Sequence, residues 1–374
     1  MKKHLVRAGI LVIILLLAVS AAAREFSSRY HRFRVTTVAD GLEHPWALAF
    51  LPGGDVLVSE REGRLRVIRD GRLLPEPVRG LPEVRVRGQG GLLDLLPHPG
   101  FSANRLLYFS YAADHPGGWT THVARGRFTG DALTDVEVLF RAEPASTGRV
   151  HFGSRLAFDP QGYLFVSIGD RGEMDRAQDL GDLAGKVVRL HDDGRIPEDN
   201  PFRDTPGARP EIFTYGHRNP QGMAVHPATG EVWTHEHGPK GGDEVNVLRP
   251  GFNYGWPVVT LGIDYTGFTI GDGLTHMPGM VDPLHHWIPS IAPSGMAFYT
   301  GGRFPRWQGD LFAGALVQRH LVRLRLVGEI VVEEERLLED LGRRIREVRA
   351  GPDGALWLLT DHDPGQVLRL EPAD

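Results

Sequence analysis

Residues 155–170 read RLAFDPQGYLFVSIGD, which is two apolar, strand-like stretches joined by a Pro/Gly turn and followed by polar residues. Apolar runs of this length bounded by turn residues are typical of the two strands of a β-hairpin. The same pattern recurs along the chain. The hairpins begin at Trp46, Leu92, Arg155, Gly222, Gly295 and Val348. A recurrence of this kind predicts one structural unit used six times.

Further strand-like stretches flank several hairpins, as in GRLRVIRDG from Gly63 and KVVRLHDDG from Lys186. Each unit therefore has about four strands, as a propeller blade requires. A β-sandwich with many hairpins is the alternative, but the similar turn in each unit and the length of the chain favour radial repetition. We predict an all-β protein, a six-bladed β-propeller of four-stranded antiparallel blades.

The N-terminus has a basic start, MKKHLVRAG, then the apolar run ILVIILLLAV and then small residues up to Ala23. This order is typical of a signal peptide, and the apolar run is shorter than the ~20 residues of a spanning helix. We therefore expect a signal peptide at 1–23 and one catalytic propeller domain at 24–374, with no membrane span left after cleavage. The protein should be periplasmic or extracellular, although a retained anchor is the competing reading.

Composition excludes several classes of function. The 374 residues carry 42 Lys and Arg against 47 Asp and Glu, a formal net charge of −5, so a nucleic-acid partner is not expected. The absence of cysteine excludes disulfides, thiolate metal sites and cysteine-attached haem. Lysine occurs only at 2, 3, 186 and 240, so cationic binding must rely on arginine.

The densest polar stretch runs from Tyr215 to Asp264 and contains GHRNPQG, EHGPKGGDE and GFNYGWP. Arg218 and Asn219 precede a proline, which disfavours helix and places both in an ordered loop. Carboxylates such as Glu244, with the tight turn at Gly238 and Pro239, offer the oxygen ligands that Ca²⁺ prefers. A surface turn with solvated charges is the alternative reading.

Other candidate residues lie in loops beside the hairpins. Gln89 lies between glycines just before a strand, where an amide can contact a ligand. His151 precedes the hairpin at 155–170 and is suited to accept a proton near neutral pH, with Asp170 and Asp175 as candidates to orient polar groups beside it. Arg319 lies in a late hairpin, and a surface arginine is nearly as good a reading of it.

Several motifs occur together in one order: GQGGLLDL, HFGSRLAFDPQG, IGDRG, LAGKVVRL, GHRNPQGMA, EHGPKGGDEVN and NYGWP. In this the chain resembles the soluble quinoprotein glucose/sorbosone dehydrogenase family, in particular its aldose sugar dehydrogenase branch, over nearly the whole mature sequence. The resemblance implies a six-bladed propeller that binds pyrroloquinoline quinone (PQQ) and calcium. It also implies oxidation of the C1 hydroxyl of aldoses to lactones, with the electrons passed to an external acceptor such as a quinone, a cytochrome or a dye.

The resemblance also implies roles for individual residues. His151 is similar to the general base that accepts the sugar hydroxyl proton as hydride leaves C1, and Arg218 to the residue that stabilises the reduced cofactor. Gln89, Asp175, Asn219 and Arg319 would contact the cofactor, with Arg323 as a further candidate for its carboxylates. Metal ligands would come from the carbonyls of Gly238 and Pro239 at the cofactor calcium, and from Glu244, Tyr254 and Asp264 at a second calcium.

Two other functions remain open at this stage. Calcium, histidine and carboxylates would also suit a calcium-dependent lactonase on the same fold, although such a hydrolase does not need Gln89, Arg218 and Asn219 around a planar anion. A non-catalytic exported propeller that binds a protein or a glycan is the third reading, because fold alone does not fix function. The sequence does not choose between a monomer and a homodimer.

Overall fold

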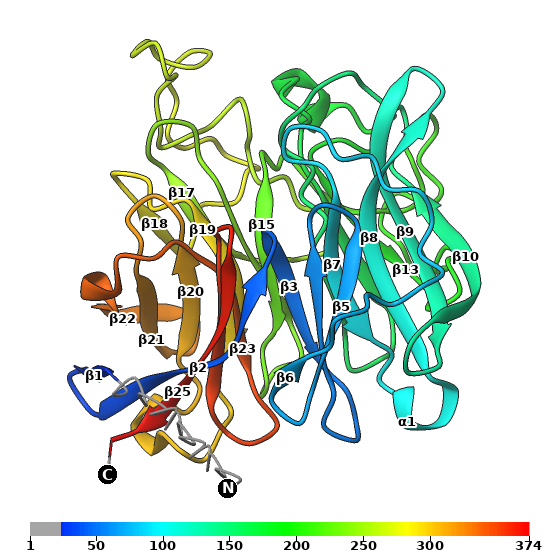
Figure 1. Ribbon diagram of the computed structural model, residues 1–374. Helices are drawn as coiled ribbons and strands as arrows, with labels where there is room; N and C mark the ends of the chain where they lie inside the picture. Colours follow the sequence, from blue (N-terminus) through cyan, green and yellow to red (C-terminus); the bar gives the residue numbers. More distant parts are fainter. Residues whose placement is uncertain (1–23, 374) are drawn as a thin grey trace, which may run out of the picture.

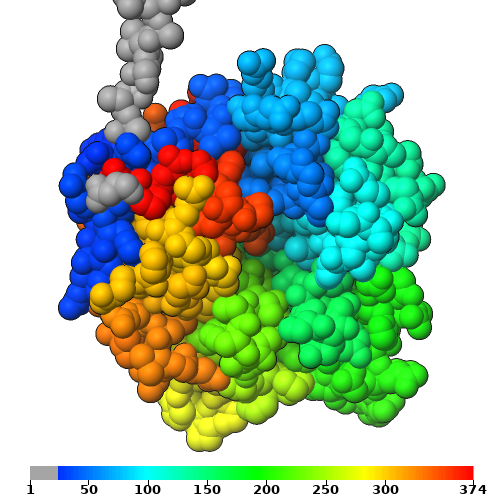
Figure 2. Space-filling view, turned by 90° about the horizontal axis from the view of Figure 1, so that it is seen from below, coloured from blue at the N-terminus to red at the C-terminus, as the bar shows by residue number. Residues whose placement is uncertain are grey.

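A computed structural model describes residues 24–373, and the predicted signal peptide lies outside this range. The chain forms six antiparallel sheets arranged around one axis, five with four strands and one with five. Seen along the axis, the blades follow one another around a disc, and the red C-terminal end meets the blue N-terminal end (Figure 2). The six-bladed β-propeller predicted from the hairpin repeat is therefore confirmed.

The first three blades follow the chain order. Blade 1 contains β3 (Pro45–Phe50), β4 (Val56–Glu60), β5 (Arg64–Arg69) and β6 (Arg72–Leu73). Blade 2 contains β7 (Leu92–Pro97), β8 (Leu106–His115), β9 (Gly118–Phe128) and β10 (Leu133–Arg141), with the one-turn helix α1 (Phe101–Asn104) between its first two strands. Blade 3 contains β11 (Leu156–Phe158), β12 (Leu164–Ile168), β13 (Lys186–Leu190) and β14 (Ile212–Tyr215), with a 3₁₀ turn at Met174–Gln178.

The other three blades close the ring. Blade 4 contains β15 (Pro220–Val225), β16 (Val232–Glu236), β17 (Asp243–Val247) and β18 (His285–Trp287). Blade 5 contains β19 (Pro293–Phe298), β20 (Leu311–Ala315), β21 (Leu321–Val327) and β22 (Ile330–Leu337), with a 3₁₀ turn at Pro305–Trp307. Blade 6 contains β23 (Ile345–Ala350), β24 (Leu356–Thr360) and β25 (Gly365–Pro372), completed by β2 (Arg32–Leu42) and β1 (Arg24–Ser27), and a 3₁₀ turn at Glu339–Leu341 precedes it.

The ends of the chain close the propeller by pairing with each other. Strand β2 lies antiparallel to β25, so the N-terminal segment supplies outer strands to the last blade. Figure 1 shows β1, β2 and β25 together at the lower left of the molecule. Closure of this kind leaves only short, protected sheet edges. The long loop between β17 and β18, olive in Figure 1, projects from the opposite end of the propeller.

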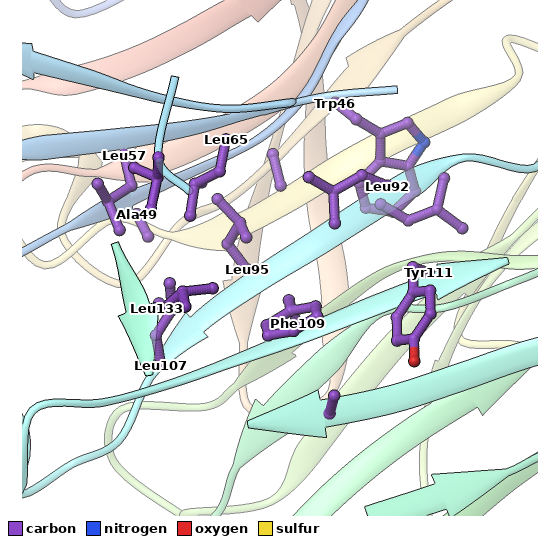
Figure 3. Packing of buried hydrophobic residues seen from close by; sticks show 14 of the residues in the cluster. Trp46, Ala49, Leu57, Leu65, Leu92, Leu95, Leu107, Phe109, Tyr111 and Leu133 are labelled. Atoms are coloured by element: carbon purple, nitrogen blue, oxygen red, sulfur yellow. The ribbon is translucent and has the colours of Figure 1, made fainter. Parts of the chain in front are cut away.

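The core lies between neighbouring blades. Strands β4 and β12 are buried along their whole length because a blade covers each face, and their sequences VLVSE and LFVSI are correspondingly apolar. Outer strand β22 alternates between exposed and covered residues. Side chains of blades 1 and 2 interdigitate in one cluster, shown in Figure 3. Labelled members are Trp46, Leu57, Leu65, Leu92, Leu95, Phe109 and Tyr111. Within residues 24–373, no helix is long and apolar enough to cross a membrane.

Candidate active site

A cavity of about 270 Å³ opens where the innermost strands of the blades begin. The residues that precede these strands line it: His44 before β3, Gln89 before β7, Asn219 before β15 and Arg344 before β23. Because the innermost strands of all blades start at the same face of a propeller, residues at equivalent positions converge there. Residues that follow second strands complete the wall, namely Arg61, His237, Leu316, Val317 and Asp361.

The cavity is strongly cationic on one side. Arg61, Arg344 and Arg346 line it, and Asp361 joins two of them. Arg344 Nη2 lies 2.6 Å from Asp361 Oδ2, and Arg346 Nη2 lies 3.1 Å from Asp361 Oδ1. Burial acts to raise the pKa of Asp361, but Arg346 and Arg344 outweigh it and hold the pKa at about 2. The opposing surfaces are apolar, with Trp46, Leu93 and Phe152.

The predicted cofactor residue Arg319 lies outside this cavity. Strand β20 ends at Ala315, so Arg319 falls in an exposed turn with a left-handed φ of 56°. Arg323 is fully buried instead between Asp310, Glu333 and Glu335 within blade 5. Arg344 and Arg346 line the cavity, and Arg319 does not. Arg344 directly precedes the first strand of its blade, as Asn219 does, and Arg346 lies within that strand. An alignment of the six repeats would have revealed this shared position.

His151 lies at the edge of the cavity, next to the lining residues Phe152 and Gly153. Its Nδ1 is 2.6 Å from Asp170 Oδ1, and 15% of its side chain is exposed. Asp170 also accepts hydrogen bonds from Trp256 Nε1 at 2.8 Å and from the Gly172 amide at 2.7 Å. Burial acts to raise the pKa of Asp170, yet the bond from His151 and the other donors lower it below the usual value.

This pairing fixes the tautomer of His151. An ionised carboxylate only accepts hydrogen bonds, so Nδ1 of His151 must carry the proton that Asp170 accepts. Nε2 then has a free lone pair, and no hydrogen bond within residues 24–373 occupies it. The backbone of His151 has a left-handed φ of 54°, and its amide donates to Gln89 Oε1 at 2.8 Å. The structure therefore joins two of the predicted residues, Gln89 and His151, in one unit.

Arg218 and Asn219 precede β15, as their position before Pro220 predicts. Arg218 Nη1 donates to the carbonyls of His237 and Gly238 at 3.2 and 2.7 Å, and its guanidinium lies over the ring of Trp256. Its Nε is buried without a hydrogen-bond partner. Asn219 lines the cavity, and its Oδ1 accepts from the Gly153 amide at 3.3 Å. Through Trp256, Arg218 is connected to Asp170 and His151.

A second, small cavity of about 10 Å³ lies beside Arg218, with room for roughly one water-sized species. Glu236 and Glu244, cross-strand partners on β16 and β17, line it together with Gly238 and Tyr254. Burial and then the neighbouring Glu236 raise the pKa of Glu244 to about 8. Two neighbouring carboxylates, with a backbone turn beside them, are suited to one hard cation.

The other predicted site residues do not gather at one place. Tyr254 donates its hydroxyl to the Val247 carbonyl at 2.5 Å and stacks on His217. Asp264 binds Thr266 within its own surface turn, and Asp175 is exposed in the 3₁₀ turn at Met174–Gln178. Pro239 is buried in the turn after Gly238. Within residues 24–373 no group of three or more His, Cys, Asp or Glu side chains gathers in a metal-binding arrangement.

Comparison with known proteins shows the family to which the chain is similar. The family described as Glucose / Sorbosone dehydrogenase matches residues 42–369. Aldose sugar dehydrogenase YliI of Escherichia coli is 46% identical over 343 residues, which cover 90% of this chain and 92% of the relative. The crystal structure of the soluble aldose sugar dehydrogenase from E. coli, in the apo form, superimposes with a TM-score of 0.88 at 45% identity, covering 91% of this chain and 99% of that chain.

A more distant solved structure contains the cofactor. The PQQ-bound form of the aldose sugar dehydrogenase from Streptomyces coelicolor superimposes with a TM-score of 0.76 at 30% sequence identity. The match covers 90% of this chain and 97% of that chain, so it includes every blade.

Proposed function

This chain belongs to the glucose/sorbosone dehydrogenase family. We propose that it is a sugar dehydrogenase of the quinoprotein type, which oxidises the C1 hydroxyl of aldoses to lactones using PQQ held with calcium. The observation that carries this proposal is the His151–Asp170 pair at the rim of a cavity whose far side is lined by arginines. A lactonase would need no such arginine-lined cavity, and none of the contacts described above favours lactone hydrolysis.

The residues present fit a flat polyanion such as PQQ. Arg344, Arg346 and Arg61 offer guanidinium groups to carboxylates, for which arginine is suited by its planar geometry. Trp46 and Phe152 offer apolar faces, and Gln89 and Asn219 offer amides at the rim. Arg61 Nε and Arg218 Nε are buried without a hydrogen-bond partner, as expected of donors reserved for a ligand. When bound, PQQ supplies an electrophilic quinone that accepts a hydride.

His151 would act as the general base. Asp170 holds the proton on Nδ1 and stabilises the imidazolium that forms when Nε2 accepts the proton of the sugar hydroxyl. Gln89 fixes the backbone of His151 through its amide. A base oriented in this way accepts the proton as hydride leaves C1, so the hydroxyl carbon becomes a carbonyl without free alkoxide.

Arg218 would stabilise negative charge that develops during the reaction. Two carbonyls and the ring of Trp256 hold its guanidinium, so little reorganisation is needed when charge appears. Asn219, the next residue, lines the larger cavity and would bind a ligand edge.

Calcium is part of the proposal because the donors fit it. Glu244 and Glu236 line one small cavity, and a divalent cation there would favour the ionised form of Glu244, whose pKa burial and Glu236 raise. The carbonyls of Gly238 and Pro239, in the turn that leads to β17, are the proposed ligands of the cofactor calcium. Export, with 1–23 as a signal peptide, and transfer of electrons to an external acceptor complete the proposal.

Reconstitution tests this function. Purified protein is loaded with PQQ and calcium, and dye reduction is followed on addition of glucose and other aldoses. We expect activity that His151→Gln abolishes. His98→Gln is the matched control, since His98 follows β7 at the opposite end of its blade from Gln89. Failure of the wild-type protein to bind PQQ would refute the proposal.

A further inference from the structure

Arg171 directly follows Asp170 and is almost fully buried, with 2% of its surface exposed. Its guanidinium does not point into the cavity but binds the loop that carries His151. Nη2 donates to the Gly148 carbonyl at 2.5 Å, and Nη1 donates to the Val150 carbonyl. The guanidinium carbon lies 3.4 Å from the ring centroid of Phe152, the residue that follows His151 in the sequence. Arg171 thus contacts residues on both sides of the proposed base.

The three backbone carbonyls before His151 differ in how far they rely on hydrogen bonds from Arg171. Gly148 O also accepts from Trp119 Nε1 at 2.9 Å, and Arg149 O accepts from the Gln89 amide at 2.8 Å. Val150 O, in contrast, has only Arg171 as a donor within residues 24–373. Val150 is half-buried, and removal of Arg171 would take away the protein donor that holds this peptide in its orientation. That peptide joins Val150 to His151.

A buried arginine of this kind is costly for a protein. Within residues 24–373, no carboxylate lies at ion-pair distance from Arg171, and its Nε has no hydrogen-bond partner. Burial of a cation without a counter-ion is unfavourable, and an apolar residue would pack against Phe152 more cheaply. The residue therefore needs a reason beyond stability.

The conformation of the base supplies that reason. His151 has a left-handed φ of 54°, a conformation that is uncommon for a residue with a Cβ and that costs strain unless contacts offset it. The backbones also approach closely: a Cβ added at Gly169 would lie 2.3 Å from the His151 carbonyl, and one added at Gly148 would lie 2.2 Å from the Arg171 carbonyl. We infer that Arg171 is a positioning residue, whose two hydrogen bonds to the 148–150 loop hold His151 on Asp170.

The first test does not depend on turnover. In protein labelled with ¹⁵N-histidine and free of cofactor, the Nδ1 proton shared with Asp170 should give a downfield signal, identified by its loss in His151→Gln. We expect Arg171→Met to broaden or shift this signal, because Met keeps an unbranched apolar side chain but donates no hydrogen bond. Arg189→Met is the matched control, since Arg189 is a buried, ring-stacked arginine of the same blade. An unchanged His151 signal in Arg171→Met would overturn the inference.

The second test rests on the proposed function and separates positioning from stability. Arg171→Met should lower kcat at least tenfold, with less than a threefold change in the PQQ dissociation constant, and Arg171→Lys should recover part of kcat through one donor. Arg189→Met should lose stability without this loss of kcat. Equal kcat losses in Arg171→Met and Arg189→Met would overturn the inference. An inactive wild-type protein would instead refute the proposed function, and the histidine spectrum would still decide the role of Arg171.

Discussion

His151 and Asp170 lie 19 residues apart, yet their side chains meet at 2.6 Å because they flank the first hairpin of blade 3. His151 precedes β11, and Asp170 follows β12, which pairs antiparallel to it. The start of one strand and the end of the next lie at the same edge of an antiparallel pair. The hairpin that defines the blade therefore also brings the proposed base to the group that orients it.

Replacement of Asp170 by Asn tests this pair. Asn is nearly isosteric, but its amide carries no charge and does not stabilise the imidazolium that forms when His151 accepts a proton. We expect kcat to fall by about 10²–10³-fold. PQQ affinity should change little, because Asp170 contacts His151 and Trp256 rather than the arginine side of the cavity. Steady-state kinetics beside a PQQ titration measure both quantities, and wild-type kcat in the variant would contradict the proposed role.

The cationic side of the cavity gives a second prediction. Arg344→Met removes a guanidinium that lines the cavity, and we expect the PQQ dissociation constant to rise more than tenfold. Arg319→Met, a substitution at an exposed turn, should leave it unchanged. Fluorescence titration of the two variants with PQQ makes the comparison. The opposite ranking would restore Arg319 as the carboxylate-binding residue and remove Arg344 from that role.

The sequence predicted the architecture well because each blade is built from local hairpins, whose turns and apolar strands are visible in short stretches. It did not predict that β2 completes blade 6, since pairing of β2 with β25 joins the two ends of the chain and leaves no local signal. The same limit applied at the site. Choosing Asp170 over Asp175 requires knowing that β12 ends at Ile168, so that Asp170 falls at the strand end and Asp175 in an exposed turn.

Glu244 gives a third prediction, with a defined pH dependence. The pKa of Glu244 is raised from 4.5 to about 8, so the folded protein holds this proton while the unfolded chain releases it. In the presence of a calcium chelator, the free energy of unfolding should therefore decrease as pH rises from about 4.5 to 8. Glu244→Gln should remove this decrease and be more stable than the wild type by about 1–3 kcal/mol at alkaline pH. Urea unfolding across this pH range measures the effect.

Addition of calcium should reverse the order of stability of the wild-type protein and Glu244→Gln. A cation that binds ionised Glu244 stabilises the wild-type protein, by about 2.7 kcal/mol at a hundredfold excess over its dissociation constant. Glu244→Gln should lose this stabilisation. Asp264→Asn should retain it, because Asp264 binds Thr266 in a surface turn away from the small cavity. Calcium stabilisation that persists in Glu244→Gln and disappears in Asp264→Asn would place the cation elsewhere.

The last prediction concerns how the N-terminal segment is held on blade 5. Tyr30, between β1 and β2, donates its hydroxyl to Glu333 Oε2 at 3.1 Å and accepts from Arg325 Nη1 at 2.7 Å. The guanidinium carbons of Arg306 and Arg323 lie 4.8 and 5.0 Å from its ring centroid. Removal of this ring leaves the buried Arg323 without an aromatic face, so Tyr30→Ala should lower the free energy of unfolding by about 2 kcal/mol.

Two further variants separate the parts of this contact. Tyr30→Phe keeps the ring and loses the hydroxyl bonds, so we expect a loss of about 1 kcal/mol. Tyr265→Ala, at a tyrosine that is 69% exposed, should change stability by less than about 0.5 kcal/mol. None of the Tyr30 variants should alter kcat, because Tyr30 lies on the outer part of the ring and the cavity lies where the innermost strands begin. A Tyr30→Ala protein as stable as the wild type would show that β2 and β25 close the propeller without this contact.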